Sequence, residues 1–210
     1  MRGLIYKEVS VFYKSVDKKM FVMASGFTLL IFYRAGAYGG MMASVMLAMM
    51  IGAQNVMSFI SDDKARWQRY QMAMPVSSFS VVASKYLSVL CTLGFGIAGS
   101  IVLNLISSIC YRSFNGSVWG ISVFIVVWIP LIWTGICLPC TYWFGVQSAQ
   151  VMGLVFVIPL FYLIKYFEDG IGVSMMADSL APYGLAAGAA AVVLFAVSLA
   201  VSVAGYARRK

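Results

Sequence analysis

Charge is scarce in this chain: only 10% of its residues are Asp, Glu, Lys or Arg, and none of them lies between Ser113 and Ile164. A membrane-spanning helix needs about 20 consecutive apolar residues, so this window predicts two spans joined by a tight turn. The apolar runs are continuous, whereas strands of a membrane β-barrel alternate in polarity, and the pattern therefore favours helices. With a hydrophobic fraction of 62% and a mean hydropathy of +0.90, the chain is predicted to be an all-α polytopic membrane protein.

Histidine is absent, which excludes catalytic Ser-His pairs and metal sites that depend on His. The chain also lacks a phosphate-binding loop of the form G-x-x-x-x-G-K-S/T, so it cannot hydrolyse ATP by itself. The predicted spans contain no Asp, Glu or His, which disfavours a transporter driven by a proton relay, and no charged ring suggests a channel. We expect no enzymatic activity, cofactor or metal on this chain; if the protein pumps, a partner must supply the energy.

Cysteine is also rare, and one pair has the spacing of a redox motif. Cys137-Leu138-Pro139-Cys140 is a C-x-x-C sequence, but it falls in a predicted span near the cytoplasmic side, where thiols stay reduced. A kink at Pro139 is the favoured interpretation.

We predict a single transmembrane domain over residues 1–210 with six membrane-spanning helices. Residues 1–19 precede the first span, 20–60 hold two spans, 61–80 form a cytoplasmic segment, 81–206 hold four spans, and 207–210 form a cytoplasmic tail. The individual spans are expected at about 20–35, 38–60, 82–108, 119–143, 147–165 and 184–206. Turn and cap residues support these bounds: Ser77 and Ser78 are expected to cap the third span, Asn115 and Gly116 to form the turn before the fourth, and Pro182 and Gly184 to open the last.

The distribution of Lys and Arg predicts the orientation. Counted by segment, twelve of the fifteen lie on one side of the six predicted spans and three on the other. Both termini are therefore expected in the cytoplasm. The net charge of +8 then reflects topology and attraction to the inner leaflet rather than binding to nucleic acid.

The first 19 residues have the pattern of an amphipathic helix lying in the cytoplasmic interface. Four apolar residues recur on one helical face and three lysines lie on the other. The apolar residues are Ile5, Val9, Phe12 and Val16, and the lysines are Lys7, Lys14 and Lys18. Such a helix either anchors the chain or acts as a lever between a cytosolic partner and the first span.

The most informative cytoplasmic segment follows the second predicted span. Ser61, Asp62 and Asp63 predict a helix start, since acidic residues complement the positive end of a helix dipole. A short helix of mixed charge with two aromatic residues is then expected over 64–70. Trp and Arg dominate binding hot spots, so we favour a docking element over a solvated loop with an interfacial Trp.

A few uncharged polar residues lie within the predicted spans: Gln54, Asn55, Asn104, Ser107, Gln147 and Gln150. Hydrogen bonding between helices is their favoured role. Lining a substrate path is the alternative.

The order of these features, and the local pattern of residues 62–86, resemble the permease subunits of ABC-2-type transporters. The pattern consists of Asp62-Asp63-Lys64, Trp67, Tyr70, Met74-Pro75-Val76-Ser77 and Ser84-Lys85-Tyr86. It is similar to that of one bacterial subgroup, which includes the permeases of phenol-soluble-modulin peptide exporters and relatives associated with peptide antibiotics.

The resemblance implies a mechanism and a set of partners. A cytosolic ATPase subunit would hold ATP and Mg, a second permease copy or homologue would complete the membrane part, and amphipathic or hydrophobic peptides would leave a bacterial cell through its cytoplasmic membrane. Residues 166–183 would form an extracellular helical hairpin; a polar outer loop that avoids positive charge is the alternative. The residues implied in ATPase coupling are Asp62, Asp63, Lys64, Arg66, Trp67, Arg69, Tyr70, Met74 and Pro75.

A non-transporting membrane scaffold or a peptide-immunity protein is the alternative. The two hypotheses differ at residues 62–70, because only a transporter requires this segment to bind an ATPase.

Overall fold

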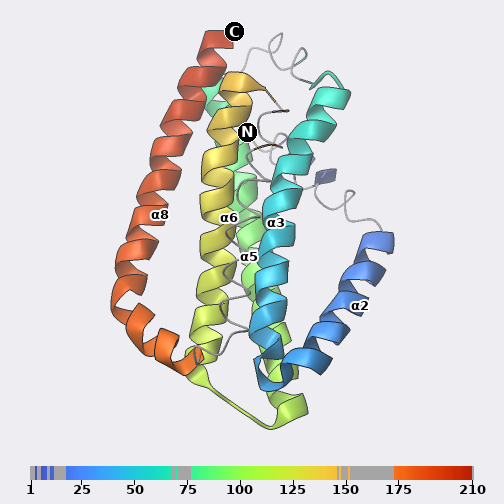
Figure 1. The fold of residues 1–210 in the computed structure, drawn as a ribbon. Coiled ribbons are helices and arrows are strands. Elements are labelled where there is room, and N and C mark those ends of the chain that lie inside the picture. Colours follow the sequence, from blue (N-terminus) through green and yellow to red (C-terminus); the bar gives the residue numbers. More distant parts are fainter. Residues whose placement is uncertain are drawn as a thin grey trace.

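The computed structural model is a bundle of long helices (Figure 1). The residues that it describes are 3, 6–8, 10–11, 18–67, 70, 77–145, 147, 151 and 173–209. Their elements are α2 (Lys18–Ala35), a 3-10 turn η1 (Gly36–Tyr38), α3 (Gly39–Lys64), α5 (Ser78–Tyr111), α6 (Gly116–Phe144) and α8 (Val173–Arg209). No strand occurs in these described ranges, which confirms the all-α prediction.

Four of these helices are long and apolar enough to cross a membrane: α3, α5, α6 and the Gly188–Arg208 part of α8. They correspond to the predicted second, third, fourth and sixth spans. The predicted first span is helical as α2 but is not among the four. The predicted fifth span, 147–165, lies almost entirely outside the described residues, as does 166–172 of the predicted outer hairpin.

The helix boundaries differ from the predictions in two places. The helix predicted to end at residue 60 continues to Lys64, and α8 begins at Val173, so Pro182 and Gly184 lie inside this helix instead of opening it. Proline is tolerated in long membrane helices because neighbouring groups can satisfy the freed carbonyl.

Two predicted turns are confirmed by their caps. Ser77 Oγ accepts a hydrogen bond from the Ser80 backbone N–H at 3.3 Å and starts α5. Asn115 Oδ1 accepts one from the Ser117 N–H at 3.1 Å and starts α6. Each cap satisfies a backbone donor that the first turn of a helix leaves free.

Helices α3, α5 and α6 pack against one another, α8 lies along α6, and α2 leans away from the bundle (Figure 1). The main apolar core joins α3, α5, α6 and α8. Its buried residues are Phe59, Val81, Val82, Tyr86, Val89, Leu138, Tyr142 and Tyr206.

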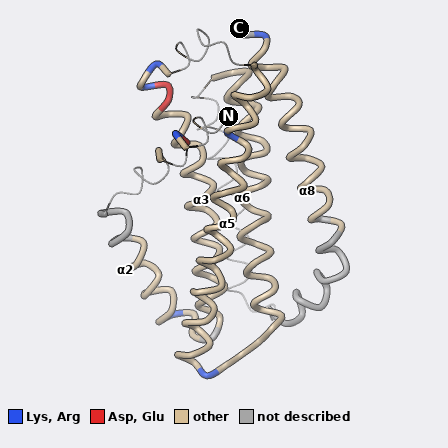
Figure 2. Tube along the Cα trace, turned by 180° about the vertical axis from the view of Figure 1, so that it is seen from behind, with Lys and Arg blue, Asp and Glu red and all other residues tan. Residues whose placement is uncertain are grey.

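The bundle has two chemically different ends. At one end of the bundle, which we call the far end, Arg34 lies in the last turn of α2 and Arg112 caps the end of α5. The other end, which we call the basic end, carries Lys64 at the end of α3, Lys85 near the start of α5 and Arg208 near the end of α8 (Figure 2). This separation agrees with the alternation of positive charge along the sequence.

Candidate functional site

Lys85 is the centre of a buried cluster of charges at the basic end. It lies two turns into α5, and only 5% of its surface is exposed. Its Nζ donates to Glu8 Oε2 at 2.7 Å, to Asp62 Oδ2 at 2.6 Å and to Ser58 Oγ at 2.7 Å. One ammonium group therefore joins α5 to the end of α3 and to the N-terminal segment.

Lys7 supplies the second positive charge. Its Nζ lies 3.1 Å from Glu8 Oε1 and also forms an ion pair with Asp62. Ser58 Oγ donates to Glu8 Oε2 at 2.9 Å. The charge cluster (Lys7, Glu8, Ser58, Asp62 and Lys85) thus contains two ammonium and two carboxylate groups. Because buried charges are tolerated only when they are paired, none of the four can be removed alone without leaving an excess charge.

Aromatic rings cover both ammonium groups. Lys85 Nζ lies 4.5 Å from the ring centre of Phe59, and Lys7 Nζ lies 4.9 Å from that of Trp67. The Trp67 ring in turn lies 6.4 Å from that of Tyr70. Cations over ring faces are attracted by the negative π surface. The charge cluster therefore also positions Trp67, the aromatic residue singled out in the sequence.

The predicted helix start at Ser61 is not observed, because Asp62, Asp63 and Lys64 form the last turn of α3. The helix ends at Lys64 and is followed by a turn, in which Arg66 has a left-handed φ of 51° and its N–H donates to the Asp63 carbonyl at 2.9 Å. Acidic residues are unfavourable at the negative end of a helix dipole, but Asp62 is neutralised there by Lys7 and Lys85. The ion pair with Lys85 of α5 therefore makes Asp62 acceptable at the end of a helix, although the local sequence pattern predicts a helix start.

The predicted coupling residues divide into a buried and an exposed set. Asp62 is buried in the charge cluster, whereas Asp63, Lys64 and Arg66 are exposed and Tyr70 is 64% exposed. Trp67 is half-buried, and its Nε1 finds no hydrogen-bond partner among the described residues. Arg69, Met74 and Pro75 lie outside the described residues.

The N-terminal segment contributes a residue that sequence reasoning missed. Glu8 is only 3% exposed. The amphipathic pattern of residues 1–19 is defined by apolar residues and lysines, and it assigns no role to an acidic residue. Its signal was an acidic residue, one of only two, in a segment with five basic residues. The structure also turns Lys7 toward the cluster, a contact that its position on the predicted polar face did not indicate. Ile5, Val9, Phe12, Lys14 and Val16 lie outside the described residues.

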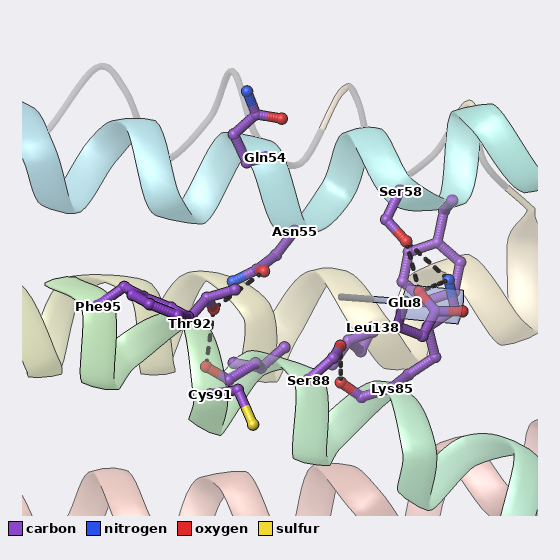
Figure 3. A pocket seen from close by; sticks show the side chains of 12 residues that line it. Glu8, Gln54, Asn55, Ser58, Lys85, Ser88, Cys91, Thr92, Phe95 and Leu138 are labelled. Atoms are coloured by element: carbon purple, nitrogen blue, oxygen red, sulfur yellow. Dashed lines mark hydrogen bonds and ion pairs between the residues drawn. The ribbon is translucent and has the colours of Figure 1, made fainter. Parts of the chain in front are cut away.

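A small cavity of about 20 Å³ adjoins the charge cluster between α3 and α5 (Figure 3). Glu8, Ser58 and Lys85 line one part of it, and Asn55 and Thr92 line another. Two of the polar span residues, Gln54 and Asn55, thus lie at this cavity, and Gln150 lies outside the described residues.

A second polar cluster, without charge, holds the same helices together toward the far end. Ser44 Oγ lies 2.9 Å from Ser100 Oγ, and Asn104 Nδ2 donates to Ser44 Oγ at 3.3 Å. Ser122 Oγ donates to Asn104 Oδ1 at 3.2 Å. This neutral cluster (Ser44, Ser100, Asn104 and Ser122) joins α3, α5 and α6 by hydrogen bonds, as predicted for polar residues inside spans.

Within the described ranges, no group of three or more His, Cys, Asp or Glu side chains could hold a metal ion. Cys137 is buried and Cys140 is partly buried, and both are reduced thiols inside α6.

Long apolar helices with charges near their ends define the class of this molecule: it is a multi-pass helical membrane protein. The family follows from comparison with known proteins, because the family described as "ABC-2 family transporter protein" matches residues 3–207. The chain belongs to this family and is the membrane component of an ABC transporter. Searches among curated proteins and among solved structures found no match.

Proposed function

We propose that this protein is the permease subunit of an ATP-driven exporter in a bacterial plasma membrane. A cytosolic ATPase subunit binds at the basic end, and a second permease copy or homologue completes the pathway. Membership of the ABC-2 family supports the ATPase partner. The resemblance of residues 62–86 to the phenol-soluble-modulin exporter subgroup supports amphipathic or hydrophobic peptides as cargo.

The charge cluster is the observation that carries this proposal. Through Lys85 it ties the N-terminal segment and the end of α3 to the start of α5, so that the three move as one body. A force applied to the exposed residues after Asp62 is then transmitted directly to two membrane helices. This arrangement suits a device that converts closure of an ATPase dimer into movement of the spans.

The surface next to the cluster has the composition of a docking site. Lys64 and Arg66 offer charge, Tyr70 offers an exposed ring, and the Trp67 Nε1 group is a donor that an acceptor on a partner could satisfy. Buried aromatic anchors surrounded by charged residues are typical of interface hot spots. In this proposal residues 62–70 contain two parts: Asp62 holds the segment in place and residues 63–70 contact the ATPase.

The proposal places both termini in the cytoplasm, since the basic end holds most of the positive charge and positive charge favours the cytoplasmic side. Lys85 and Arg208 lie at that end, and Arg34 and Arg112 at the other.

The test is to purify the detergent-solubilised protein from its own cell and identify what co-purifies by mass spectrometry. We expect an ATPase subunit in near-equal amount. Replacing residues 65–70 by a Gly/Ser linker should remove it while leaving Asp62, and hence the charge cluster, intact. A chain that purifies without an ATPase would contradict the proposal and favour a scaffold or immunity protein.

A double variant refines the test. Arg66→Ala with Trp67→Ala should abolish ATP hydrolysis stimulated by the permease while the protein stays folded. Arg112→Ala with Trp119→Ala removes the same two types of side chain at the far end and should leave this stimulation unchanged. Equal effects of the two double variants would refute a specific role for residues 66 and 67.

A further inference from the structure

Helices α6 and α8 end side by side at the basic end of the bundle (Figure 1). The ring of Trp143, one residue before the end of α6, lies against α8, and its Nε1 donates to the Val201 carbonyl at 3.1 Å. A Cβ on Gly205 would lie 2.6 Å from the same Nε1, so the ring fits only because position 205 has no side chain. Trp143 is therefore fixed in position against α8.

The Trp143 ring in turn positions an arginine. The guanidinium carbon of Arg208 lies 5.7 Å from the centre of the ring, within the range of a cation–π contact. Arg208 is exposed, and within the described part of the chain no carboxylate forms an ion pair with it. A guanidinium over a ring face keeps several N–H donors free, and these donors match the oxygens of a phosphate or a carboxylate. The two helix ends thus present a positioned cation to an external anion.

The face of α8 that carries Arg208 is otherwise apolar. The residues four, seven and eleven positions before it are Ala204, Val201 and Val197, which share its side of the helix. All of them are exposed, and the part of α8 that is long and apolar enough to cross a membrane ends at Arg208. In a bilayer this face contacts hydrocarbon, so the guanidinium at its end lies at the level of the lipid headgroups.

Exposed aromatic rings mark the same level on α6. Phe144, the last residue of this helix, is 76% exposed, and Trp143 is 39% exposed. Aromatic residues at the ends of membrane helices are typical of the membrane–water interface. An arginine beside them, at the end of a lipid-facing side, is placed for an anion that belongs to the membrane. A carboxylate of a cytosolic protein would have to reach the lipid-facing side of α8 to meet it.

We infer that Arg208, positioned by Trp143, binds the phosphate of an anionic phospholipid whose acyl chains lie along the exposed apolar face of α8. Hydrogen bonds between a guanidinium and a phosphate are strengthened by charge on both partners, and the negative surface of a membrane attracts basic residues near the ends of its spans. The site is specific, in contrast to the general attraction of the basic end to a negative surface. It does not depend on the proposed transport function.

The test measures lipid binding to the purified full-length protein by native mass spectrometry. The protein is titrated in detergent with dioleoyl phosphatidylglycerol, which is anionic, and with dioleoyl phosphatidylcholine, which has the same chains and no net charge. We expect the tightest site to prefer phosphatidylglycerol. Arg208→Gln should weaken this binding roughly tenfold, the effect of losing about one hydrogen bond between charged groups. Inorganic phosphate should not compete with the lipid, because it lacks the acyl chains that contact α8.

Two further variants separate a specific site from diffuse charge. Arg208→Lys keeps the charge but loses the planar set of donors, so binding should weaken, although less than in Arg208→Gln. Arg112→Gln removes an arginine at the far end and should leave the binding unchanged. Both arginines are exposed, so these substitutions should not affect folding. The unfolding temperature of each variant checks this.

Undiminished binding in Arg208→Gln, an equal loss in Arg112→Gln, or full binding in Arg208→Lys would each overturn the inference. Displacement of the lipid by inorganic phosphate would also overturn it, because the site would then take a free anion. Co-purification of the ATPase is measured on the same variants. Loss of the ATPase in Arg208→Gln with unchanged lipid binding would assign Arg208 to the protein partner instead of the membrane.

Discussion

The two ends of the α3–α5–α6 bundle are held together by different chemistry. At the basic end four charged groups share a buried site, and one of the elements they join is a separate N-terminal segment. Toward the far end, serine and asparagine side chains link the helices without charge, and the Cβ that Gly40 lacks would lie 2.9 Å from Asn104 Cα. The first arrangement depends on mutual neutralisation, and the second on close contact between backbones.

This difference separates two functions of polar groups in a membrane protein. Neutral hydrogen bonds add modest stability between helices, and their removal leaves no excess charge. A buried charge pair contributes little net stability compared with apolar packing, but removal of one partner is strongly destabilising. The stability of the basic end therefore depends on keeping its opposite charges paired, whereas the stability of the far end depends on the close steric fit of its helices. Four predictions test this contrast.

The largest effect is expected for Lys85→Met, which leaves the carboxylates of Glu8 and Asp62 buried with only Lys7 to balance them. We expect a loss of about 3–5 kcal/mol of stability, measured by thermal unfolding in detergent. The matched control is the double variant Asp62→Asn with Lys85→Met, which leaves Lys7 paired with Glu8, restores neutrality and should recover most of the loss. A double variant as unstable as Lys85→Met would show that packing, not charge, dominates this end.

At the far end the largest effect is expected for Gly40→Val. The added side chain would meet the backbone of α5 at Asn104, so the two helices must separate, with an expected cost of about 1–3 kcal/mol. Gly94→Val is the control, because a Cβ at Gly94 meets nothing within 4 Å. Equal unfolding temperatures for the two variants would show that α3 and α5 are not in close contact there.

A smaller loss is expected for Asn104→Leu, which removes hydrogen bonds to Ser44 and Ser122 but adds no charge. We predict a destabilisation of about 1–2 kcal/mol, measured in the same way. It should be independent of ionic strength, since no ion pair is involved. A clear dependence on salt would mean that the far end is electrostatically coupled to the rest of the molecule.

The smallest effect is expected for Lys7→Gln. The Lys7 side chain is 24% exposed, and Lys85 still pairs with both carboxylates. Partly exposed ion pairs contribute about 1 kcal/mol or less and are screened by salt. The loss should therefore be small at low ionic strength and shrink as salt is added; a loss as large as that of Lys85→Met would place Lys7 at the centre of the cluster instead.

The sequence predicted the parts of the fold that local patterns determine. The apolar runs indicated α3, α5 and α6, and Ser77 and Asn115 indicated where two of them begin. The same local reasoning failed at Ser61, where consecutive aspartates have the pattern of a helix start. These residues instead end α3, because Lys85 in another helix neutralises Asp62.

The centre of the candidate site could not be predicted for the same reason. Glu8 and Lys85 are far apart in the sequence, and each has an ordinary local interpretation, one as part of a surface helix and the other as a topology signal. Only the packing of the N-terminal segment against α3 and α5 brings them within 2.7 Å of each other. The importance of Trp67 was predictable from its residue type, whereas its contact with Lys7 was not.

The position of Glu8 also sets an order of events during synthesis of the chain. Glu8 leaves the ribosome 50 residues before Ser58 and 77 residues before Lys85, the groups that will enclose its carboxylate. A carboxylate cannot enter an apolar layer without a partner, so the N-terminal segment must remain at the membrane surface until α3 and the start of α5 have been inserted. The N-terminal segment can therefore dock only after α3 and the start of α5 have inserted in the correct orientation. A nascent chain that stops before Lys85 lacks the main group that could hold Glu8 in its buried position.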